Sequence, residues 1–333
     1  MKKFLLIFVV FPVLLITCKQ EENLAVAFYN TENFFDTADD PHKNDNEFLP
    51  GSEKHWTEER YRKKLDDVAR VLSEIDTVSF PVFIGLCEIE NRKVLDDLIS
   101  TPELAPERYS VAHFESPDIR GIDVALLYRS DFFRLAHAEA IPIKFPDNPR
   151  YKTRDILHVS GKIGKEEFHV FVNHWPSRIG GDEKTEPERV FVASVLKQKV
   201  EEVLASRPDA NIIIMGDMND EPANKSLFET LDARAPGSGS ELVNLMYPLD
   251  QQNEGTYYFR GQWNMLDNLV VSASLLDGKG YEAVGAKGFV FRKNWMEFKN
   301  KNGMLLPNRT YGGSNYYGGV SDHFPVYFML KKQ

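Results

Sequence analysis

Three short apolar runs, each ending in a polar side chain, constrain the fold of this chain most. The runs and the polar residues that follow them are 81–87 with Glu88, 168–172 with Asn173 and His174, and 211–216 with Asp217. Runs of this length and composition suit β-strands that are buried on both faces of a sheet. In such sheets the loops beyond the strand ends carry the ligand chemistry. The sequence therefore predicts an α/β protein whose polar residues gather at one edge of its sheets.

The C-terminal segment places a carboxylate and an imidazole side by side at the start of another strand. Asp322 and His323 precede an apolar run over residues 326–330. Asp267 and Asn219 stand next to apolar segments in a similar way. A single Asp or Asn after a strand is commonly a turn former or a helix cap. Because the arrangement recurs along the chain, we expect these residues to share one site.

Two short motifs give the chain a specific resemblance. Gly216-Asp217-Met218-Asn219 and Ser321-Asp322-His323-Phe324-Pro325-Val326 together resemble the endonuclease/exonuclease/phosphatase superfamily, which includes deoxyribonuclease I, apurinic endonucleases, neutral sphingomyelinases and inositol polyphosphate 5-phosphatases. Further matching segments follow in the family's order: Phe28-Tyr29-Asn30, Cys87-Glu88, Asn173-His174-Trp175 and Leu266-Asp267-Asn268-Leu269-Val270. The resemblance covers residues 24–331. It implies a four-layer α/β sandwich like that of deoxyribonuclease I, with two packed mixed β-sheets flanked by helices.

The resemblance also implies a divalent metal site. A phosphate ester resists hydrolysis because its anionic oxygens repel the nucleophile, so the site must offset that charge. Glu88 is the expected main ligand of Mg²⁺, with Mn²⁺ as the other candidate, since Mg²⁺ prefers one or two carboxylates. Asn30 and Asp322 are expected to assist the metal, and Asn30 also to contact the substrate. Glu32 is either a further metal ligand or a turn carboxylate.

The catalytic roles follow from the same resemblance. His323 is the expected general base, because an imidazole titrates near neutral pH. Asp267 would bind the far ring nitrogen and fix its tautomer, as the carboxylate of a catalytic triad does. Asp217 and Asn219 would hold the attacking water and the phosphate oxygens. His174 would stabilise the charge on the scissile phosphate.

Arg154 is expected to contact the substrate phosphate, as an arginine of deoxyribonuclease I does. It precedes a predicted strand. The alternative for an arginine at the entry to a strand is an ordinary surface residue.

The segment before the predicted domain resembles a bacterial lipoprotein signal. Lys2 and Lys3 precede an apolar stretch over residues 4–16, which is too short to span a bilayer comfortably but suits a signal peptide core. The sequence predicts a signal peptide over 1–17, a lipidated Cys18, and a short tether over 18–23. We therefore expect an exported lipoprotein, anchored at the outer membrane or cell surface. A secreted protein cleaved at another position is the alternative.

Helical periodicity and overall charge complete the prediction. Apolar residues recur at helical spacing over 57–75, and a second helix fits 186–205. The chain carries a formal charge of −10, which becomes two units more negative when Lys2 and Lys3 leave with the signal peptide. A strongly acidic surface argues mildly against processive binding to a polyanion such as DNA, although local arginines and a metal suffice for a nuclease.

The predicted function is metal-dependent phosphoester hydrolysis, with a phosphodiesterase or nuclease preferred. The substrate would be a nucleic acid, a phospho-metabolite or a lipid. One alternative is a lipid or inositol phosphate phosphatase, or a sphingomyelinase-like enzyme. Another is a non-catalytic surface lipoprotein that binds ligands with the same fold. The sequence indicates no protein partner.

Overall fold

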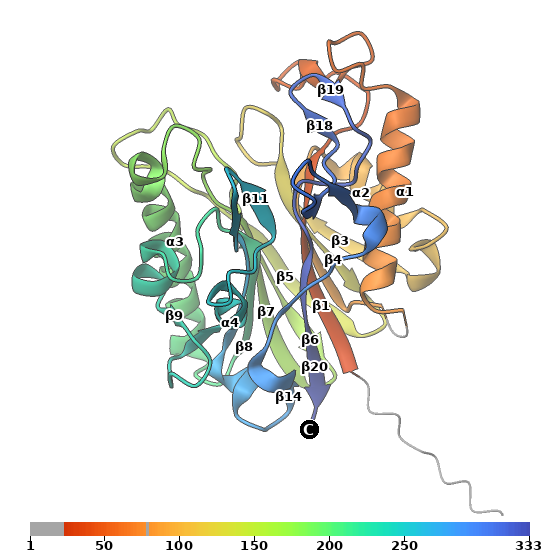
Figure 1. Cartoon of the computed structure of the whole chain (residues 1–333). Helices are drawn as coiled ribbons and strands as arrows, with labels where there is room; N and C mark the ends of the chain where they lie inside the picture. Colours follow the sequence, from red (N-terminus) through yellow and green to blue (C-terminus); the bar gives the residue numbers. More distant parts are fainter. Residues whose placement is uncertain (1–22, 78–79) are drawn as a thin grey trace, which may run out of the picture.

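The computed structural model describes residues 23–77 and 80–333. The predicted signal peptide over 1–17, Cys18 and nearly all of the predicted tether over 18–23 lie outside the described residues. From Asn23 onward the chain forms two large β-sheets covered by helices (Figure 1). Within the described ranges, no helix combines the length and apolar character that crossing a bilayer requires.

The first sheet contains seven strands in the order β14-β20-β1-β2-β4-β3, with β15 paired to β20. The strands are β1 (Asn23–Phe34), β2 (Phe83–Ile89), β3 (Tyr109–His113), β4 (Asp123–Arg129), β14 (Tyr281–Ala283), β15 (Phe289–Val290) and β20 (Val326–Lys332). Strands β1 and β2 are parallel, and the other described pairings of this sheet are antiparallel. It is a mixed sheet with a parallel pair at its centre.

The second sheet also contains seven strands, in the order β5-β6-β7-β8-β13-β10-β9. They are β5 (Phe133–Ile141), β6 (Ile156–Ile163), β7 (Glu166–His174), β8 (Asn211–Asp217), β9 (Ala233–Arg234), β10 (Leu242–Asn244) and β13 (Asp267–Ser272). Strands β7 and β8 are parallel, and so are β9 and β10. Each large sheet therefore has a central parallel pair, β1 with β2 and β7 with β8.

Within residues 23–77 and 80–333, four α-helices and three small hairpins complete the fold. The helices are α1 (Glu58–Ile75), α2 (Arg92–Ile99), α3 (Asp182–Ser206) and α4 (Tyr247–Asp250). The hairpins pair β11 (Tyr257–Phe259) with β12 (Gln262–Asn264), β16 (Glu297–Lys299) with β17 (Leu305–Pro307), and β18 (Tyr311–Gly312) with β19 (Asn315–Tyr316). Short 3-10 turns lie at Asn46–Phe48, Ala105–Glu107, Ala273–Leu276, Val284–Ala286 and Asn294–Met296, and a π-helical turn at Ser226–Thr230.

The two predicted helices are present. Helix α1 buries the apolar stripe that predicted it, namely Tyr61, Leu65, Val68, Leu72 and Ile75. Helix α3 begins at Asp182, four residues before the predicted start. The added turn is fixed by the fully buried Arg189, whose guanidinium donates to the Asp182 carboxylate at 2.5 Å and to the Thr185 hydroxyl at 2.7 Å. Because this turn is held by a charged contact and not by apolar residues at helical spacing, the apolar pattern did not predict it.

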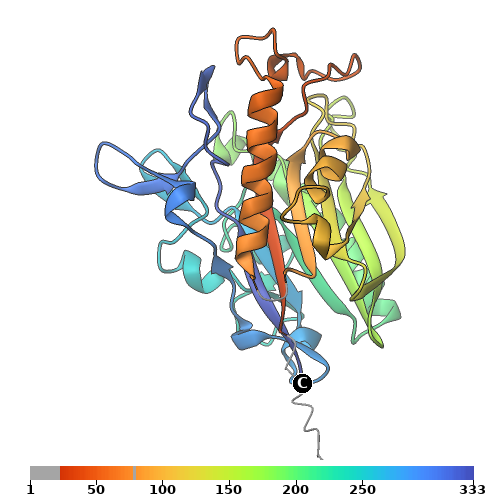
Figure 2. The ribbon, with the colours of Figure 1, turned by 90° about the vertical axis from the view of Figure 1, so that its right-hand side faces the viewer.

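The elements stack as four layers. One cluster of buried apolar side chains lies between the two sheets, and two others lie between each sheet and its helices. Figure 1 shows α1 and α2 on the outer side of the first sheet and α3 on the outer side of the second. In Figure 2, α1 runs along the face of its sheet. The predicted α/β sandwich of two packed mixed sheets flanked by helices is confirmed.

The site-bearing edge of the sandwich follows from strand direction. Strand β1 starts at the lower end of Figure 1 and runs upward, and the β11 and β18 hairpins lie at the upper end. Because parallel neighbours end at the same edge of a sheet, each central pair delivers two carboxyl ends there. The loops at that edge can therefore draw residues from both sheets together.

Candidate active site

The strand register brings the predicted polar residues together. In the first sheet Asn30 of β1 lies opposite Cys87 of β2, one residue before Glu88. In the second sheet His174 of β7 lies opposite Asp217 of β8. Strand β13 runs antiparallel to β8 and begins with Asp267 directly opposite Asp217. One edge of the sandwich thus collects carboxylates, an amide and an imidazole.

Several of these residues lie at irregularities of the backbone. Strand β2 shifts register between Cys87 and Ile89, and Glu88 at this bulge has φ of 60°. Asn33 and Asn219 also have positive φ, at 52° and 49°. A bulge re-aims a side chain, and left-handed conformations of non-glycine residues cluster at functional sites. The chain holds these strained conformations where the carboxylate of Glu88 meets its partners.

Asn30 connects the carboxylates of the two sheets. Its Nδ2 donates to Asp217 Oδ2 at 2.9 Å and to Glu88 Oε1 at 3.4 Å. The other oxygen of Glu88 accepts from the backbone N–H of Asn33 at 2.8 Å. Asp217 Oδ1 accepts from the backbone N–H of Asn219 at 2.9 Å. The amide and the two carboxylates are therefore held as one rigid group.

His323 and Asp267 form a buried pair. Nδ1 of His323 lies 2.7 Å from Asp267 Oδ2, and the far ring nitrogen, Nε2, lies 3.9 Å from Asp217 Oδ2. The ring of Tyr257 stacks on the imidazole at a centroid distance of 4.8 Å. Ser321 accepts from the backbone N–H of His323 and donates to Asn30 O. These contacts orient the imidazole with Nε2 toward the neighbouring carboxylate.

The carboxylates around His323 control its protonation. Burial acts to lower the pKa of the imidazole, but Asp267, Asp217 and Asp322 outweigh burial and raise the pKa well above its usual value. Burial also raises the pKa of the Asp217 carboxyl to about 7, against the lowering effect of His323. The imidazole of His323 and the carboxylate of Asp217 therefore each favour the charged form of the other.

His174 has the opposite protonation behaviour. Burial, followed by the charges of Arg154 and Arg120, lowers the pKa of its imidazole well below the usual value. Its Nε2 lies 3.8 Å from Asp217 Oδ2 and 3.9 Å from Glu88 Oε1. Among the described residues, Nδ1 has no hydrogen-bond partner. His174 is thus a neutral imidazole whose Nε2 faces the carboxylates.

The donor set fits a hard divalent cation. The side chain of Glu88 is 16% exposed. It lines the active-site cavity, with Oε1 beside Asn30 and His174. Asp322 lines the same pocket, and Arg309 lies 3.5 Å from its Oδ2. Ligand atoms of Asp217, Asp267 and His323 also lie within 4.8 Å of one another. Carboxylate oxygens beside open space are the environment in which Mg²⁺ binds while keeping several waters. Asn30 turns Nδ2 toward these carboxylates, and its Oδ1 accepts from the backbone N–H of Glu32 at 2.9 Å.

The floor of a cavity of about 430 Å³ is formed by Glu88, His174, Asp217, Asp322 and His323, whereas Asn30 and Asp267 do not line it. Its walls come from the loops of both sheets. The first sheet contributes Phe48, Lys54, Arg120 and Tyr311, and the second contributes Ser177, Arg178, Ile179, Tyr257 and Phe259. Each sheet therefore contributes aromatic and cationic side chains to the cavity lining.

Arg154 lies behind this floor. It is 5% exposed, and its guanidinium donates to His174 O at 3.2 Å, to Trp175 O at 2.6 Å and to Asp118 Oδ2 at 3.0 Å. It is not among the residues that line the cavity. The substrate contact predicted for Arg154 stays a prediction, and its hydrogen bonds serve to hold the His174 backbone.

Arg120 and Arg178 line the cavity and were missed by sequence reasoning. Arg120 lies on the loop between β3 and β4, and Arg178 lies between β7 and α3. Nε of Arg178 donates to Asn219 O at 2.7 Å. The position of Arg178 four residues after His174, just past a predicted strand end, was the one available signal.

Glu32, predicted to be either a further metal ligand or a turn carboxylate, contacts the loop that precedes β18. Its carboxylate accepts backbone N–H bonds from Thr310 at 2.7 Å and from Tyr311 at 3.2 Å. Nζ of the buried Lys64 donates to Glu32 O, Thr310 Oγ1 and Val320 O. Burial raises the pKa of Glu32 to about 7. These bonds tie Glu32 to the start of the β18 loop, and the residue also lines the active-site cavity, so both alternatives stay predictions.

Comparisons with known proteins agree with this geometry. A sequence model of the Endonuclease/Exonuclease/phosphatase family matches residues 25–332. No match was found among curated proteins.

Several solved structures share the fold. An endonuclease/exonuclease/phosphatase family protein from Bacteroides thetaiotaomicron is 18% identical, with 94% of this chain and 99% of that chain covered and a TM-score of 0.59. A mannosyl-6-phosphatase of the same organism is 18% identical, with coverages of 92% and 99% and a TM-score of 0.58. TDP2 of D. rerio, complexed with a single-strand DNA product, is 15% identical, with coverages of 93% and 99% and a TM-score of 0.56. At such identities the likeness shows the fold alone.

Proposed function

The chain belongs to the endonuclease/exonuclease/phosphatase family of phosphoester hydrolases, and from this premise we propose that it is a metal-dependent phosphodiesterase. The observation that carries the proposal is the buried pair of His323 and Asp267 beside the carboxylates of Asp217 and Glu88. A paired imidazole next to carboxylates that fit a cation is what attack by water on a phosphate requires.

His323 would remove the proton of the attacking water. In the deprotonated form that acts as a base, Nδ1 would donate to Asp267, and the lone pair would lie on Nε2, toward Asp217. Asp217 and Asn219 would orient that water and the phosphate oxygens. Tyr257 packs on the ring of His323 and prevents it from turning away.

His174 would stabilise charge on the scissile phosphate. As a neutral imidazole it can donate from Nε2 to a phosphate oxygen while adding no net charge. Glu88, Asn30 and Asp322 would hold a Mg²⁺ or Mn²⁺ ion. When bound, that ion offsets the negative charge that builds on the phosphate oxygens.

An exposed aromatic ring at the cavity supports a diester as the substrate. A diester carries a second substituent on its phosphate, and Phe259 in the cavity lining offers a ring to it, whereas the lining rings of Phe48 and Tyr311 are buried, at 4% and 7% exposure. Exposed aromatic rings stack on nucleobases. Phe259 is 50% exposed and is open to such a contact. We therefore favour an oligonucleotide or dinucleotide ester over a compact phosphomonoester.

A sugar phosphatase is the second candidate. Lys54, Arg120 and Arg178 line the cavity, and three cations suit the dianion of a phosphomonoester. The mannosyl-6-phosphatase has a similar fold. Lipid phosphate and sphingomyelin hydrolysis, and ligand binding without catalysis, are the remaining possibilities for this fold.

An activity panel tests the proposal. The purified protein is incubated with bis(p-nitrophenyl) phosphate and with p-nitrophenyl phosphate, each with Mg²⁺ or Mn²⁺ and with chelator. A second set of assays contains plasmid DNA, single-stranded oligonucleotides, sugar and inositol phosphates, and sphingomyelin. We expect metal-dependent turnover of the diester and of oligonucleotides above that of the monoesters. Preference for monoesters would overturn the diester assignment, and no metal-dependent turnover at all would favour a binding protein.

We also propose that the enzyme is an exported lipoprotein anchored through Cys18. Strand β1 begins with Asn23, five residues after this cysteine, at the opposite end of the sandwich from the β11 and β18 hairpins (Figure 1). An anchor there would leave the active site directed away from the membrane, toward soluble substrates. Palmitate labelling that is lost in Cys18→Ala would support the anchor, and equal labelling of both proteins would exclude it.

A further inference from the structure

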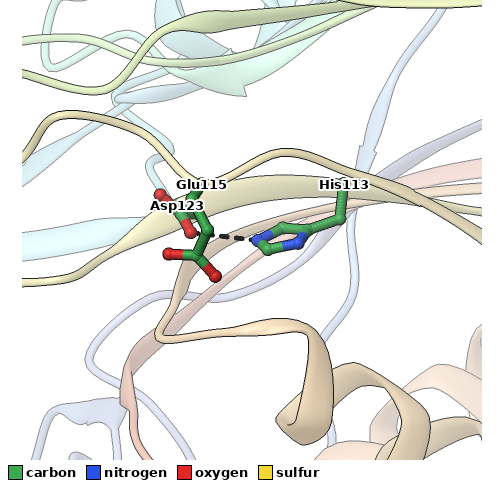
Figure 3. Close-up of side chains that lie close together, drawn as sticks. All are labelled: His113, Glu115 and Asp123. Carbon is green, nitrogen blue, oxygen red and sulfur yellow. Dashed lines mark hydrogen bonds and ion pairs between the residues drawn. The ribbon is translucent and has the colours of Figure 1, made fainter. Parts of the chain in front are cut away.

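A second group of potential metal ligands lies at the base of the β3–β4 hairpin. His113 is the last residue of β3, Glu115 follows two residues later, and Asp123 is the first residue of β4. Figure 3 shows the three side chains pointing toward one another. One ligand atom from each lies within 4.8 Å of the others. None of the three belongs to the proposed catalytic machinery or lines the active-site cavity.

Two of the three ligands are buried and already oriented. The side chain of His113 is 4% exposed and that of Asp123 is fully buried. Nε2 of His113 lies 3.0 Å from Asp123 Oδ2, while Asp123 Oδ1 accepts from the Ser116 backbone N–H at 2.8 Å. The backbone bond fixes the carboxylate and leaves Oδ2 directed at the imidazole. Little rearrangement is then needed to place an ion between them.

The third ligand adds a second carboxylate with little compensating charge. The nearest lysine, Lys43, has its Nζ 4.0 Å from Glu115 Oε2 and donates instead to Ser116 O at 2.9 Å. A divalent cation would relieve the repulsion between the two carboxylates more fully than this distant ammonium.

We propose that His113, Glu115 and Asp123 bind a divalent transition metal ion such as Zn²⁺, separately from the catalytic cation. An imidazole nitrogen with two carboxylates suits Zn²⁺, whereas Mg²⁺ and Ca²⁺ prefer oxygen ligands alone. Two ligand atoms about 2.0 Å from a tetrahedral ion lie roughly 3.3 Å apart. The 3.0 Å gap between His113 and Asp123 needs to widen only slightly to reach that separation.

The bound ion would restrain the β3–β4 loop, which extends to the active-site cavity. The loop between β3 and β4 carries Asp118, which pairs with Arg154 at 3.0 Å, and Arg120, which lines the cavity. Ser116 also donates from its hydroxyl to Ile122 O at 3.1 Å, so the base of the loop is closed by short-range bonds. An ion at this base ties β3 to β4 and limits the movement of Arg120.

Zinc titration of variants tests the proposal. Zn²⁺ is titrated calorimetrically into the metal-stripped full chain in saturating Mg²⁺, which occupies the hard-cation site. The proteins are the wild type, Glu115→Gln, His113→Gln, and Glu103→Gln as a control. Glu103 is exposed and lies before β3, so its substitution removes the same charge without touching the cluster. The melting temperature of each protein is measured with and without Zn²⁺.

We expect the wild type and Glu103→Gln to bind one more Zn²⁺ ion than Glu115→Gln and His113→Gln, or to bind it at least about tenfold more tightly. Zn²⁺ should raise the melting temperature of the first two proteins more than that of the others, because an ion that binds only the folded state stabilises it. The side chain of Glu115 is 55% exposed, so Glu115→Gln is expected to fold even if His113→Gln does not. Identical stoichiometry and affinity in wild type and Glu115→Gln would overturn the proposal.

Discussion

The floor and the rim of the cavity are built by different means. The floor, with Asp217 and His323, sits at strand ends and is nearly inaccessible to solvent. The rim, with Phe259 at the tip of the β11 hairpin and Ile179 on a loop, is 50% and 84% exposed at these residues. Strand pairing fixes the floor, whereas connecting segments such as those of the rim are generally more mobile and variable. Under the proposed function, the rigid floor would carry the chemistry and the exposed rim would select the substrate.

Removing the base should have the largest effect. In His323→Ala we expect kcat to fall by on the order of 10²–10⁴, because general base catalysis contributes about that much. The melting temperature should change little beyond the loss of one buried pair. The matched control is His137→Ala, since His137 has a 60% exposed side chain far in sequence from the motifs. A folded His323→Ala with wild-type turnover would break the assignment of the floor to catalysis.

The next largest effect is expected on stability, from the substitution of Lys64, which links strand β1 to the loop that precedes β18. Lys64 is 2% exposed and joins Glu32 O to Thr310 and Val320 at the start of the β18 loop. Lys64→Met should lower the free energy of unfolding by about 3 kcal/mol, because it leaves buried acceptors unpaired. Denaturant unfolding measures this loss. Lys63→Met, one residue earlier on the exposed face of α1, is the control and should stay within about 0.5 kcal/mol.

Asp267 should set the pH dependence of the reaction. The base works only when it is deprotonated, so activity should rise with pH through the raised pKa of His323. Asp267 raises that pKa, so Asp267→Asn should move the acid limb of the kcat/KM profile to lower pH. It should also reduce kcat by on the order of 10², because the ring loses its tautomeric partner. An acid limb that stays in place in Asp267→Asn would show that His323 is not the titrating base.

The rim should show the smallest effect and a different kinetic signature. Phe259→Ala should raise KM for an oligonucleotide by about tenfold, the loss of one stacking contact, while kcat stays near the wild-type value. The KM for bis(p-nitrophenyl) phosphate should rise less. If kcat fell as much as kcat/KM, the rim would take part in the transition state and the separation from the floor would fail.

The same division explains how much could be predicted from the sequence. The apolar runs before Glu88, His174 and Asp217 predicted buried strands. Each of these polar residues follows the end of its apolar run, which predicted that they gather at one edge of the sheets. The pairing of His323 with Asp267 was predicted only through the family resemblance. The two residues are 56 positions apart, and no local sequence pattern indicates which distant side chains meet.

The rim and the supporting contacts could not be predicted in this way. Arg120 and Arg178 stand on loops, where charged residues are common and carry no periodicity. Arg154 was predicted to contact the substrate phosphate, and its sequence context gave no sign that its guanidinium would donate to His174 O, Trp175 O and Asp118. Long-range hydrogen bonds of this kind depend on tertiary packing, which a local pattern does not encode.

Parallel measurement of metal binding and turnover tests the central claim most directly. Mn²⁺ is titrated into metal-stripped wild type and Glu88→Gln, and hydrolysis of bis(p-nitrophenyl) phosphate is followed in the same samples. We predict that hydrolysis by the wild type saturates together with Mn²⁺ binding, and that Glu88→Gln shifts both curves to higher Mn²⁺ concentration by the same factor. Full hydrolysis in excess chelator, or unchanged curves in Glu88→Gln, would contradict a catalytic cation held at the strand ends.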